Sequence, residues 1–282
     1  MSTPRVSVCI PVYQGEDTLA VTMGSVLAQT FTDFELVVLD NGCTDRSGEI
    51  ARSFDDPRVR VERNEETLPV NANWNRVVAL SRAPLIKFLC ADDLIHPQCL
   101  EIQVPLLDAD ASLSLVAHRQ HLVDAHGRMI APGRALRGLL GKRSRRQVLR
   151  RVVRSGANPI GSSSGLLFRR AAFEATEGFR RDPTFVTDLD LFLQLLEYGP
   201  MLGMPESLAA FRVSPGTITA DAGRRIYVAQ RAYTQEVAAR SGVRRVDRVV
   251  ASLAAPGARR RREAAYFVGR LGHRRTPTGA AT

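Results

Sequence analysis

The stretch Leu85-Ile86-Lys87-Phe88-Leu89-Cys90-Ala91-Asp92-Asp93 joins an apolar run to two adjacent carboxylates. A run of this length, rich in leucine, isoleucine and phenylalanine, predicts a buried β-strand. The acidic pair follows that strand directly. In open α/β sheets, ligands bind beyond the carboxyl ends of the strands, so Asp92 and Asp93 are expected at a ligand-binding edge.

Two interpretations of the acidic pair are open. Asp92 and Asp93 repel each other, and burying both is costly without a partner, which a hard divalent cation such as Mg²⁺ or Mn²⁺ would provide. Such a cation in turn suggests a phosphate. Alternatively, Asp93 is the N-cap of a helix that begins at Leu94-Ile95, near Pro97. The surrounding sequence is needed to choose between them.

Composition places the chain among globular proteins. It has 282 residues, 44% of them hydrophobic, which suffices for one large core or a core with a smaller appendage. The N-terminus does not resemble a signal peptide, and no apolar stretch is long enough to span a bilayer. The four cysteines show neither CxxC spacing nor clustered histidines, which favours reduced thiols in a cytosolic protein.

Positive charge is concentrated in two segments. The net charge is +10, yet residues 224–282 contain 14 arginines against three acidic residues, and residues 134–154 contain no acidic residue. A solvated arginine-rich surface explains this pattern, and so does attraction to anionic lipids or to a phosphate-bearing ligand. The arginine runs lack interleaved aromatic residues, so specific nucleic-acid binding is not expected.

Strand and helix patterns alternate along the first third, which predicts a mostly parallel sheet covered by helices. The predicted strands are residues 6–10 (ended by Pro11), 35–39, 59–61, 85–90, 113–117, 166–168, a segment near Leu202, and 208–212. The predicted helices start at Asp17 or Thr18 and at Thr44 or Asp45, and cover 71–82, 97–107, 144–154 and 188–198. Residues 158–165 predict a flexible loop, and the chain beyond Thr219 predicts helices with a polar, arginine-rich end.

Three kinds of side chain follow the predicted parallel strands. They are the aromatic ring of Tyr13, the carboxylate of Asp40 and the Asp92-Asp93 pair. In a right-handed doubly wound sheet these strand ends share one edge. Tyr13 alone is readily explained by packing, and Asp40 by the turn that follows it. Together, a ring, an acceptor for a base N–H and a metal-binding pair favour a nucleotide-diphosphate site.

The chain resembles family-2 glycosyltransferases of the GT-A fold, over roughly residues 4–220. The matching motifs are Pro11-Val12-Tyr13-Gln14, residues 25–30, residues 34–45, Ala91-Asp92-Asp93, Gly178-Phe179, residues 188–193 and Phe211-Arg212. The resemblance implies a GT-A (Rossmann-like) α/β fold with a mixed, mostly parallel sheet flanked by helices and a C-terminal helical extension. The expected organisation is a GT-A domain at 1–218, with a nucleotide-binding half (1–110) and an acceptor half (111–218), and a basic helical extension at 219–282.

The resemblance also implies roles for single residues. Pro11, Val12 and Tyr13 would line the nucleoside pocket with Glu16 nearby, Asp40 would hydrogen-bond the pyrimidine, and Asn75 would occupy a cleft position on the third helix. Asp92 would face the ribose or the metal shell, Asp93 would coordinate Mn²⁺ or Mg²⁺, and Asp188 would be the catalytic base.

These roles imply an inverting, metal-dependent glycosyltransferase. It would move a sugar from a UDP-sugar, or a dTDP-sugar, to an acceptor hydroxyl of a glycan, glycolipid or secondary metabolite. A cation stabilises the leaving diphosphate, and a base on the opposite side activates the hydroxyl, which inverts the anomeric centre. Asp188 lies at a helix start, where the helix dipole is expected to keep it ionised near neutral pH. As a plain first-turn acid it would need no chemistry.

Two further functions are compatible with the sequence. One is a non-catalytic, nucleotide-binding scaffold with the same fold. The other is a nucleotidyltransferase, although no glycine- and arginine-rich triphosphate loop is present. A cytoplasmic protein, peripheral on the inner membrane face through its basic tail, is the expected location.

Several positions depart from the usual family pattern. Cys90 stands where an aspartate is frequent, which leaves Asp92 and Asp93 to bind the metal. The other departures are Gln14 for Asn, Asn41 for an acidic residue, Cys43 for Ser, Trp74 for Arg, Thr187 for Glu and Ser214 for His. None removes a carboxylate assigned above. Acceptor choice is expected in residues 158–165 and in the C-terminal helices, because loops on a rigid scaffold usually carry specificity.

Overall fold

The computed structural model describes residues 3–180, 186–214, 224–243 and 247. Within them, ten strands form one sheet in the order β3-β2-β1-β4-β9-β6-β10-β5, with β7 paired to β6 and β8 to β10. The strands are β1 (Val6–Val12), β2 (Phe34–Asp40), β3 (Val59–Arg63), β4 (Leu85–Phe88), β5 (Leu94–Ile95), β6 (Leu115–Val123), β7 (Met129–Arg134), β8 (Gly141–Arg143), β9 (Leu166–Arg169) and β10 (Met201–Arg212).

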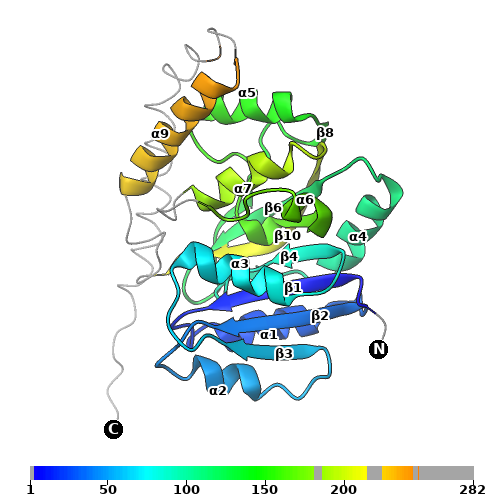
Figure 1. Ribbon diagram of the computed structural model, residues 1–282, viewed down its shortest axis with the longest axis vertical. Coiled ribbons are helices and arrows are strands. Elements are labelled where there is room, and N and C mark those ends of the chain that lie inside the picture. The colour runs from blue at the N-terminus through cyan, green and yellow to red at the C-terminus, as the bar shows by residue number, and fades with distance from the viewer. Residues whose placement is uncertain (1–2, 181–185, 215–223, 244–246, 248–282) are drawn as a thin grey trace.

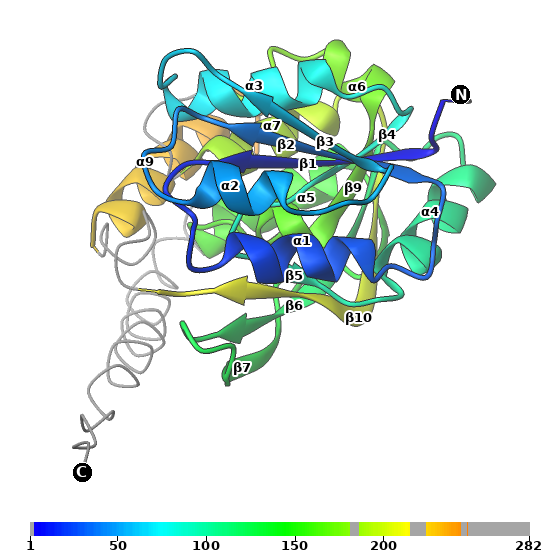
Figure 2. The same cartoon turned by 90° about the horizontal axis from the view of Figure 1, so that it is seen from below.

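Helices cover both faces of the sheet (Figure 1). Figure 2 shows α1 on one face and α3 with α7 on the other. The helices are α1 (Leu19–Leu27), α2 (Ser47–Arg52), α3 (Val70–Leu80), α4 (Cys99–Ala109), α5 (Arg145–Ser155), the 3₁₀ turn η1 (Ser163–Gly165), α6 (Arg170–Glu174), α7 (Thr187–Leu195) and α9 (Arg224–Arg240). None of the helices described here combines the length and the apolar character needed to cross a bilayer.

The strand residues divide between two hydrophobic cores with a period of two. On β1, Val8 and Ile10 belong to the core shared with α1 and α4, whereas Cys9 belongs to the core shared with α3, α5 and α7. Every residue of β1 and β2 is buried. Strands covered on both faces need continuous apolar sequence, which is why these two segments were readable as strands.

The sheet is mixed and mostly parallel, as predicted. β1 pairs in parallel with both β2 and β4, and β2 pairs in parallel with β3. β9 runs antiparallel to β4 and to β6, and β6 pairs in parallel with β10. The carboxyl ends of β1, β2, β3 and β4 therefore share one edge of the molecule.

The predicted end of the first strand at Pro11 is wrong, because β1 continues to Val12. Leu89 donates a hydrogen bond to the Cys9 carbonyl, and Asn41 donates one to the Val12 carbonyl. The backbone N–H and C=O groups of odd-numbered β1 residues therefore point toward β4. Pro11 is one of these residues, but it lies beyond the last residue pair between β1 and β4. Its missing N–H breaks no hydrogen bond of the ladder.

The C-terminal half differs from prediction at another proline. The two strands expected near Leu202 and at 208–212 are one strand, β10, whose pairing with β6 shifts between Met204 and Ala209. Pro205 lies at this irregularity and makes one strand look like two in the sequence. α9 is helical as expected beyond Thr219. The predicted arginine-rich end, residues 248–282, lies outside the described residues.

Candidate active site

The Asp92-Asp93 pair lies in the turn that follows β4. Asp93 donates its backbone N–H to the Cys90 carbonyl at 3.1 Å, which closes the turn. Thr18, just before α1, and Thr22, within α1, each donate a hydroxyl hydrogen bond of 2.9 Å to the Ala91 carbonyl. The hydroxyl of Thr18, predicted as a candidate helix cap, is therefore used to fix this turn and caps no helix.

The helix-cap interpretation of Asp93 is wrong. Leu94–Ile95 form β5, which pairs with β10, and the next helix begins only at Cys99. Asp93 instead accepts a hydrogen bond of 3.1 Å from the backbone N–H of Arg212 on β10. The Arg212 guanidinium donates to the Asp92 carbonyl at 2.9 Å and to the Ala125 carbonyl at 2.8 Å. Arg212 thus ties the acidic turn to the distant half of the sheet.

Asp92 and Asp93 place two carboxylates close together at the edge of the sheet. Asp93 is fully buried, and its Oδ2 has no hydrogen-bond partner within the described part of the chain. Burial, together with the charge of Asp92, raises the pKa of Asp93 well above its ordinary value. Burial also raises the pKa of Asp92. An unpartnered buried carboxylate oxygen beside a second carboxylate is the donor set that a divalent cation satisfies.

Asp188 joins this group from the opposite half of the chain. It lies in the first turn of α7, and its Oδ1 also has no hydrogen-bond partner within the described residues. Burial raises the pKa of Asp188 to about 6, although the Ser163 backbone partly offsets the effect. The pKa therefore moves against the helix-dipole expectation, because desolvation outweighs the dipole. The charge of Asp188 in turn raises the pKa of Cys90 and of Asp93, so these groups share one site.

The loop before β9 was predicted to be flexible, but hydrogen bonds hold it. Asn158 accepts from the Ile160 N–H at 3.0 Å and donates to the Gly161 carbonyl at 2.7 Å. Ser162 donates its hydroxyl to Gln120 Oε1 at 3.0 Å. The loop leads into η1, whose residues 163–165 are buried and contact β4, β6 and β10. These hydrogen bonds hold the loop in one conformation, with Ser163 beside Asp188 and Cys90.

The loops that follow β1 and β2 are joined by side-chain hydrogen bonds. The Gln14 side chain donates to Thr44 Oγ1 and accepts from the Thr44 N–H, both at 2.9 Å. Glu16 accepts from the Arg46 N–H at 3.1 Å. Tyr13, which follows β1 directly and precedes Gln14, has 60% of its surface exposed. A ring this exposed, next to a rigid loop pair, is available to stack on a planar ligand.

Asp40 is more enclosed than its predicted role suggested. It is 1% exposed, accepts from the Cys43 N–H at 2.8 Å and pairs with the Arg63 guanidinium. Pro11 and Val12 are also buried, within β1. These buried residues support the backbone at the carboxyl ends of β1 and β2. Only Tyr13 among them presents a large exposed surface.

Asn75 faces a backbone partner. Its side chain accepts from the Phe179 N–H at 2.9 Å and donates to the Phe179 carbonyl at 3.1 Å. Gly178 makes this clamp feasible, because its φ is +64° and a Cβ there would lie 2.4 Å from Asn75 Oδ1. Trp74, at the position of the frequent arginine, packs against Phe88 and Phe179 with ring centroids 5.1 Å away. This part of α3 fixes the segment that precedes α7.

A buried charged cluster that the sequence did not reveal holds α7 in place. Asp190 is 1% exposed and accepts from Arg180 at 2.9 Å, from Gln194 at 3.0 Å and from the Tyr233 hydroxyl at 2.6 Å. Tyr233 belongs to α9, so the C-terminal helix is tied to the helix that carries Asp188. A hydrophobic pattern signals α7, but nothing local in the sequence signals a partner 43 residues away.

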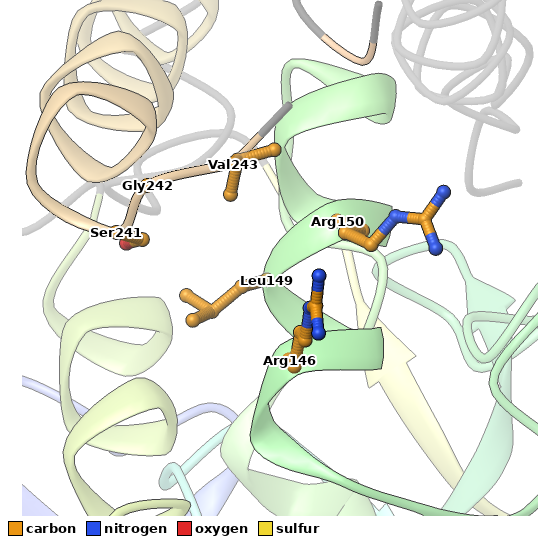
Figure 3. A pocket seen from close by; sticks show the side chains of 6 residues that line it. All are labelled: Arg146, Leu149, Arg150, Ser241, Gly242 and Val243. Carbon is orange, nitrogen blue, oxygen red and sulfur yellow. The ribbon is translucent and has the colours of Figure 1, made fainter. Parts of the chain in front are cut away.

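The basic segment 144–154 is the predicted helix, α5. It packs beside α9 and leaves a small pocket lined by Arg146, Leu149, Arg150, Ser241, Gly242 and Val243 (Figure 3). Arg150 and Arg154 pair with the buried Asp247. None of the candidate site residues lines this pocket.

The mixed α/β sheet with helices on both faces (Figure 1) is a GT-A type of fold. A model of the family described as glycosyl transferase family 2 matches residues 7–176. The chain belongs to this family and is a glycosyltransferase.

Two relatives illustrate the similarity. An uncharacterised protein of Mycobacterium tuberculosis is 30% identical over 224 residues, which cover 77% of this chain and 69% of that protein. The succinoglycan biosynthesis protein ExoU of Rhizobium meliloti is 33% identical over 244 residues, covering 80% of this chain and 68% of that protein.

Solved structures confirm the GT-A fold. Mannosyltransferase PcManGT from Pyrobaculum calidifontis, in complex with GDP-Man and Mn²⁺, has a TM-score of 0.64 and 17% identity, covering 100% of this chain and 77% of that chain. S. aureus TarS 1–349, in complex with UDP-GlcNAc, has a TM-score of 0.60 and 16% identity, covering 83% of this chain and 70% of that chain.

Proposed function

We propose that this glycosyltransferase is metal-dependent and inverting, and that it uses a nucleotide sugar, with a UDP-sugar favoured over a dTDP-sugar. The observation that carries the proposal is the buried Asp93 carboxylate, whose Oδ2 has no partner in the described residues, beside Asp92 and Asp188. An unpaired buried carboxylate lowers the stability of the fold, so its presence favours a functional role.

Asp93 and Asp92 are the residues that would hold Mn²⁺ or Mg²⁺. Their oxygens are hard donors, and together they fit a hard cation. When bound, the cation would stabilise the negative charge of the departing nucleoside diphosphate. Arg212 would help to keep both residues in position, because its N–H donates to the Asp93 carboxylate and its guanidinium donates to the Asp92 carbonyl.

Asp188 would take the proton from the acceptor hydroxyl. Its pKa of about 6 leaves it mainly ionised at neutral pH, yet closer to the operating pH than an ordinary aspartate, as suits a general base. Attack from the side opposite the leaving diphosphate inverts the anomeric carbon. The tie from Asp190 to Tyr233 and Arg180 would keep the start of α7 fixed during this step.

Tyr13 would stack on the nucleobase, with Glu16 fixing the neighbouring loop and Pro11 and Val12 forming the floor. Asp40 still has lone pairs that could accept a pyrimidine N–H. Its existing contacts with Cys43 and Arg63 mainly stabilise the turn after β2. Asn75 would act through the Phe179 segment. The UDP-GlcNAc complex of the TarS fragment supports a uridine donor, and the GDP-Man complex of PcManGT makes a guanosine donor the outcome to compare.

We further propose that residues 1–110 bind the nucleotide, that 111–218 bind the acceptor, and that 219–282 form the basic extension. The name of the relative ExoU supports a glycan acceptor.

α5 carries five arginines, and Arg146 is exposed beside the pocket of Figure 3. These charges support a cytoplasmic protein that contacts the inner membrane face. Co-sedimentation with phosphatidylglycerol vesicles checks this contact, and equal sedimentation with phosphatidylcholine vesicles contradicts it.

A thermal-shift screen of nucleotides and nucleotide sugars, with Mn²⁺ and with EDTA, tests the proposed donor. A bound ligand raises the unfolding temperature by mass action, so UDP and one UDP-sugar are expected to raise it only with Mn²⁺. Tyr13→Ala should weaken UDP affinity by about tenfold, as expected for one lost stacking contact.

Tyr198→Ala, which removes a tyrosine with 50% of its surface exposed, is the matched control and should bind UDP as the wild type does. The absence of any nucleotide-dependent shift would contradict the proposal. Pyrophosphate release from a nucleoside triphosphate would instead favour a nucleotidyltransferase.

A further inference from the structure

A thiol stands beside the carboxylate pair. The Sγ of Cys90 and one carboxylate oxygen from each of Asp92 and Asp93 all lie within 4.8 Å of one another. The other three cysteines, Cys9, Cys43 and Cys99, are buried, and Cys90 is partly exposed. Cys90 is therefore the cysteine that reaches the acidic site.

The surroundings of the thiol are acidic. The charged groups that act on it are Asp93, Asp92 and Asp188. Its hydrogen-bond contact is the Ser163 hydroxyl, at a distance of 4.0 Å, which is at the limit for sulfur. Asp93 Oδ2, fully buried and unpartnered among the described residues, is an independent observation that points to a cationic ligand at this cluster. A cation is the ligand that would satisfy both the orphaned oxygen and the surrounding negative charge.

The spacing suits a single ion bound by sulfur and oxygen together. Metal–sulfur bonds of about 2.3 Å and metal–oxygen bonds of about 2.1 Å place the donor atoms of a tetrahedral ion roughly 3.4 to 3.6 Å apart. The three donor atoms lie within 4.8 Å of one another, so side-chain movements of about 1 Å or less bring them to that spacing. The hydrogen bonds from Thr18 and Thr22 to the Ala91 carbonyl hold the backbone of the turn while the side chains move.

We propose that Cys90 is a third ligand of the metal site and gives it a preference for thiophilic divalent cations, such as Co²⁺, Zn²⁺ and Cd²⁺, over Mg²⁺. The inference rests on the proposed metal site at Asp92 and Asp93. As the cation binds, a sulfur–metal bond forms and the thiol proton passes to solvent. Thiolate is a soft ligand that Mg²⁺ avoids, whereas these three ions accept it readily.

Titration of the metal-free, full-length chain with Co²⁺ and Cd²⁺ tests the inference without requiring activity. Thiolate ligation produces a charge-transfer absorption in the ultraviolet, and calorimetry on the same samples measures how much metal is bound. The wild type is expected to show this absorption. Cys90→Ser should lose it, and Cys99→Ser, which removes a buried thiol on α4, should retain it.

Selectivity provides the second measurement. Cys90→Asp restores an oxygen donor at this position, so the ratio of the Mg²⁺ and Co²⁺ dissociation constants should fall by at least about tenfold relative to the wild type. An unchanged ratio would overturn the inference.

The two proposals fail in distinguishable ways. Co²⁺ binding that requires Asp93 but shows no charge-transfer absorption, or an absorption that persists in Cys90→Ser, overturns the role of Cys90 and leaves the metal site standing. An absence of Co²⁺ binding to the wild type, even with UDP present, overturns both.

Discussion

Asp93→Asn is expected to reduce metal-dependent sugar transfer by on the order of a thousandfold while leaving the chain folded. The asparagine oxygen can still accept the hydrogen bond from the Arg212 N–H, so the turn after β4 should persist. What is lost is the negative charge that would hold the cation. Nucleotide release from the donor identified by the screen, measured across a Mn²⁺ titration, provides the test.

The same variant should be more stable than the wild type in metal-free buffer at neutral pH. The pKa of Asp93 is raised above its unfolded value, so the stability that protonation of this carboxyl supports is fully present below about pH 4 and is lost as pH rises through the folded pKa. Asparagine carries no charge and avoids that loss. The unfolding temperatures of the two proteins should converge at pH 4.

Asp55→Asn, at an exposed position, is the control and should change neither property. Transfer by Asp93→Asn at the wild-type rate, or wild-type transfer in EDTA, would refute the metal site.

Asp188→Asn is expected to bind donor normally and to lose transfer by about 10²- to 10⁴-fold, the usual contribution of a general base. In the wild type, turnover should rise with pH through about 6, because only the ionised carboxylate accepts the proton. The variant should lack this rise. Steady-state rates between pH 5 and 8, together with donor affinity by calorimetry, separate the chemical step from binding.

Stability gives a second measure of the same residue. The pKa of Asp188 is raised to about 6 from 3.8, so its stabilising contribution is present below about pH 4 and lost as pH rises through 6. Asp188→Asn should therefore be roughly 2–3 kcal/mol more stable than the wild type at pH 8. Glu197→Gln, beyond the other end of α7, should leave turnover unchanged. Undiminished transfer by Asp188→Asn would remove it as the base.

Local sequence was sufficient to predict the parallel part of the sheet. β1, β2 and β4 are buried on both faces, so their apolar runs are nearly continuous. The antiparallel insertion of β9 between β4 and β6 could not be predicted, because strand direction is set by pairing partners far along the chain. Pro11 and Pro205 misled the prediction, since each lies where no ladder hydrogen bond is needed or where the ladder is already irregular.

The carboxylates of the candidate site were predictable for a local reason. Asp40 ends the apolar strand β2, Asp92 and Asp93 come shortly after the apolar strand β4, and these strand ends define the edge. The groups that support these carboxylates were not predictable, because each supporting residue is distant in sequence from the residue that it contacts. Arg212 reaches Asp93 across 119 residues and Tyr233 reaches Asp190 across 43. The raised pKa of Asp188 also depends on burial by the folded chain, which the helix-dipole argument could not include.

Calorimetric titration of UDP into the wild type with Mn²⁺, into the wild type with EDTA, and into Asp93→Asn with Mn²⁺ tests the central claim most directly. It needs neither the sugar nor the acceptor to be known. UDP is expected to bind in the first titration and to bind at least tenfold more weakly in the other two, because the diphosphate would be held through the cation at Asp92 and Asp93. Equal affinity in all three titrations would contradict a metal-dependent nucleotide site at this edge.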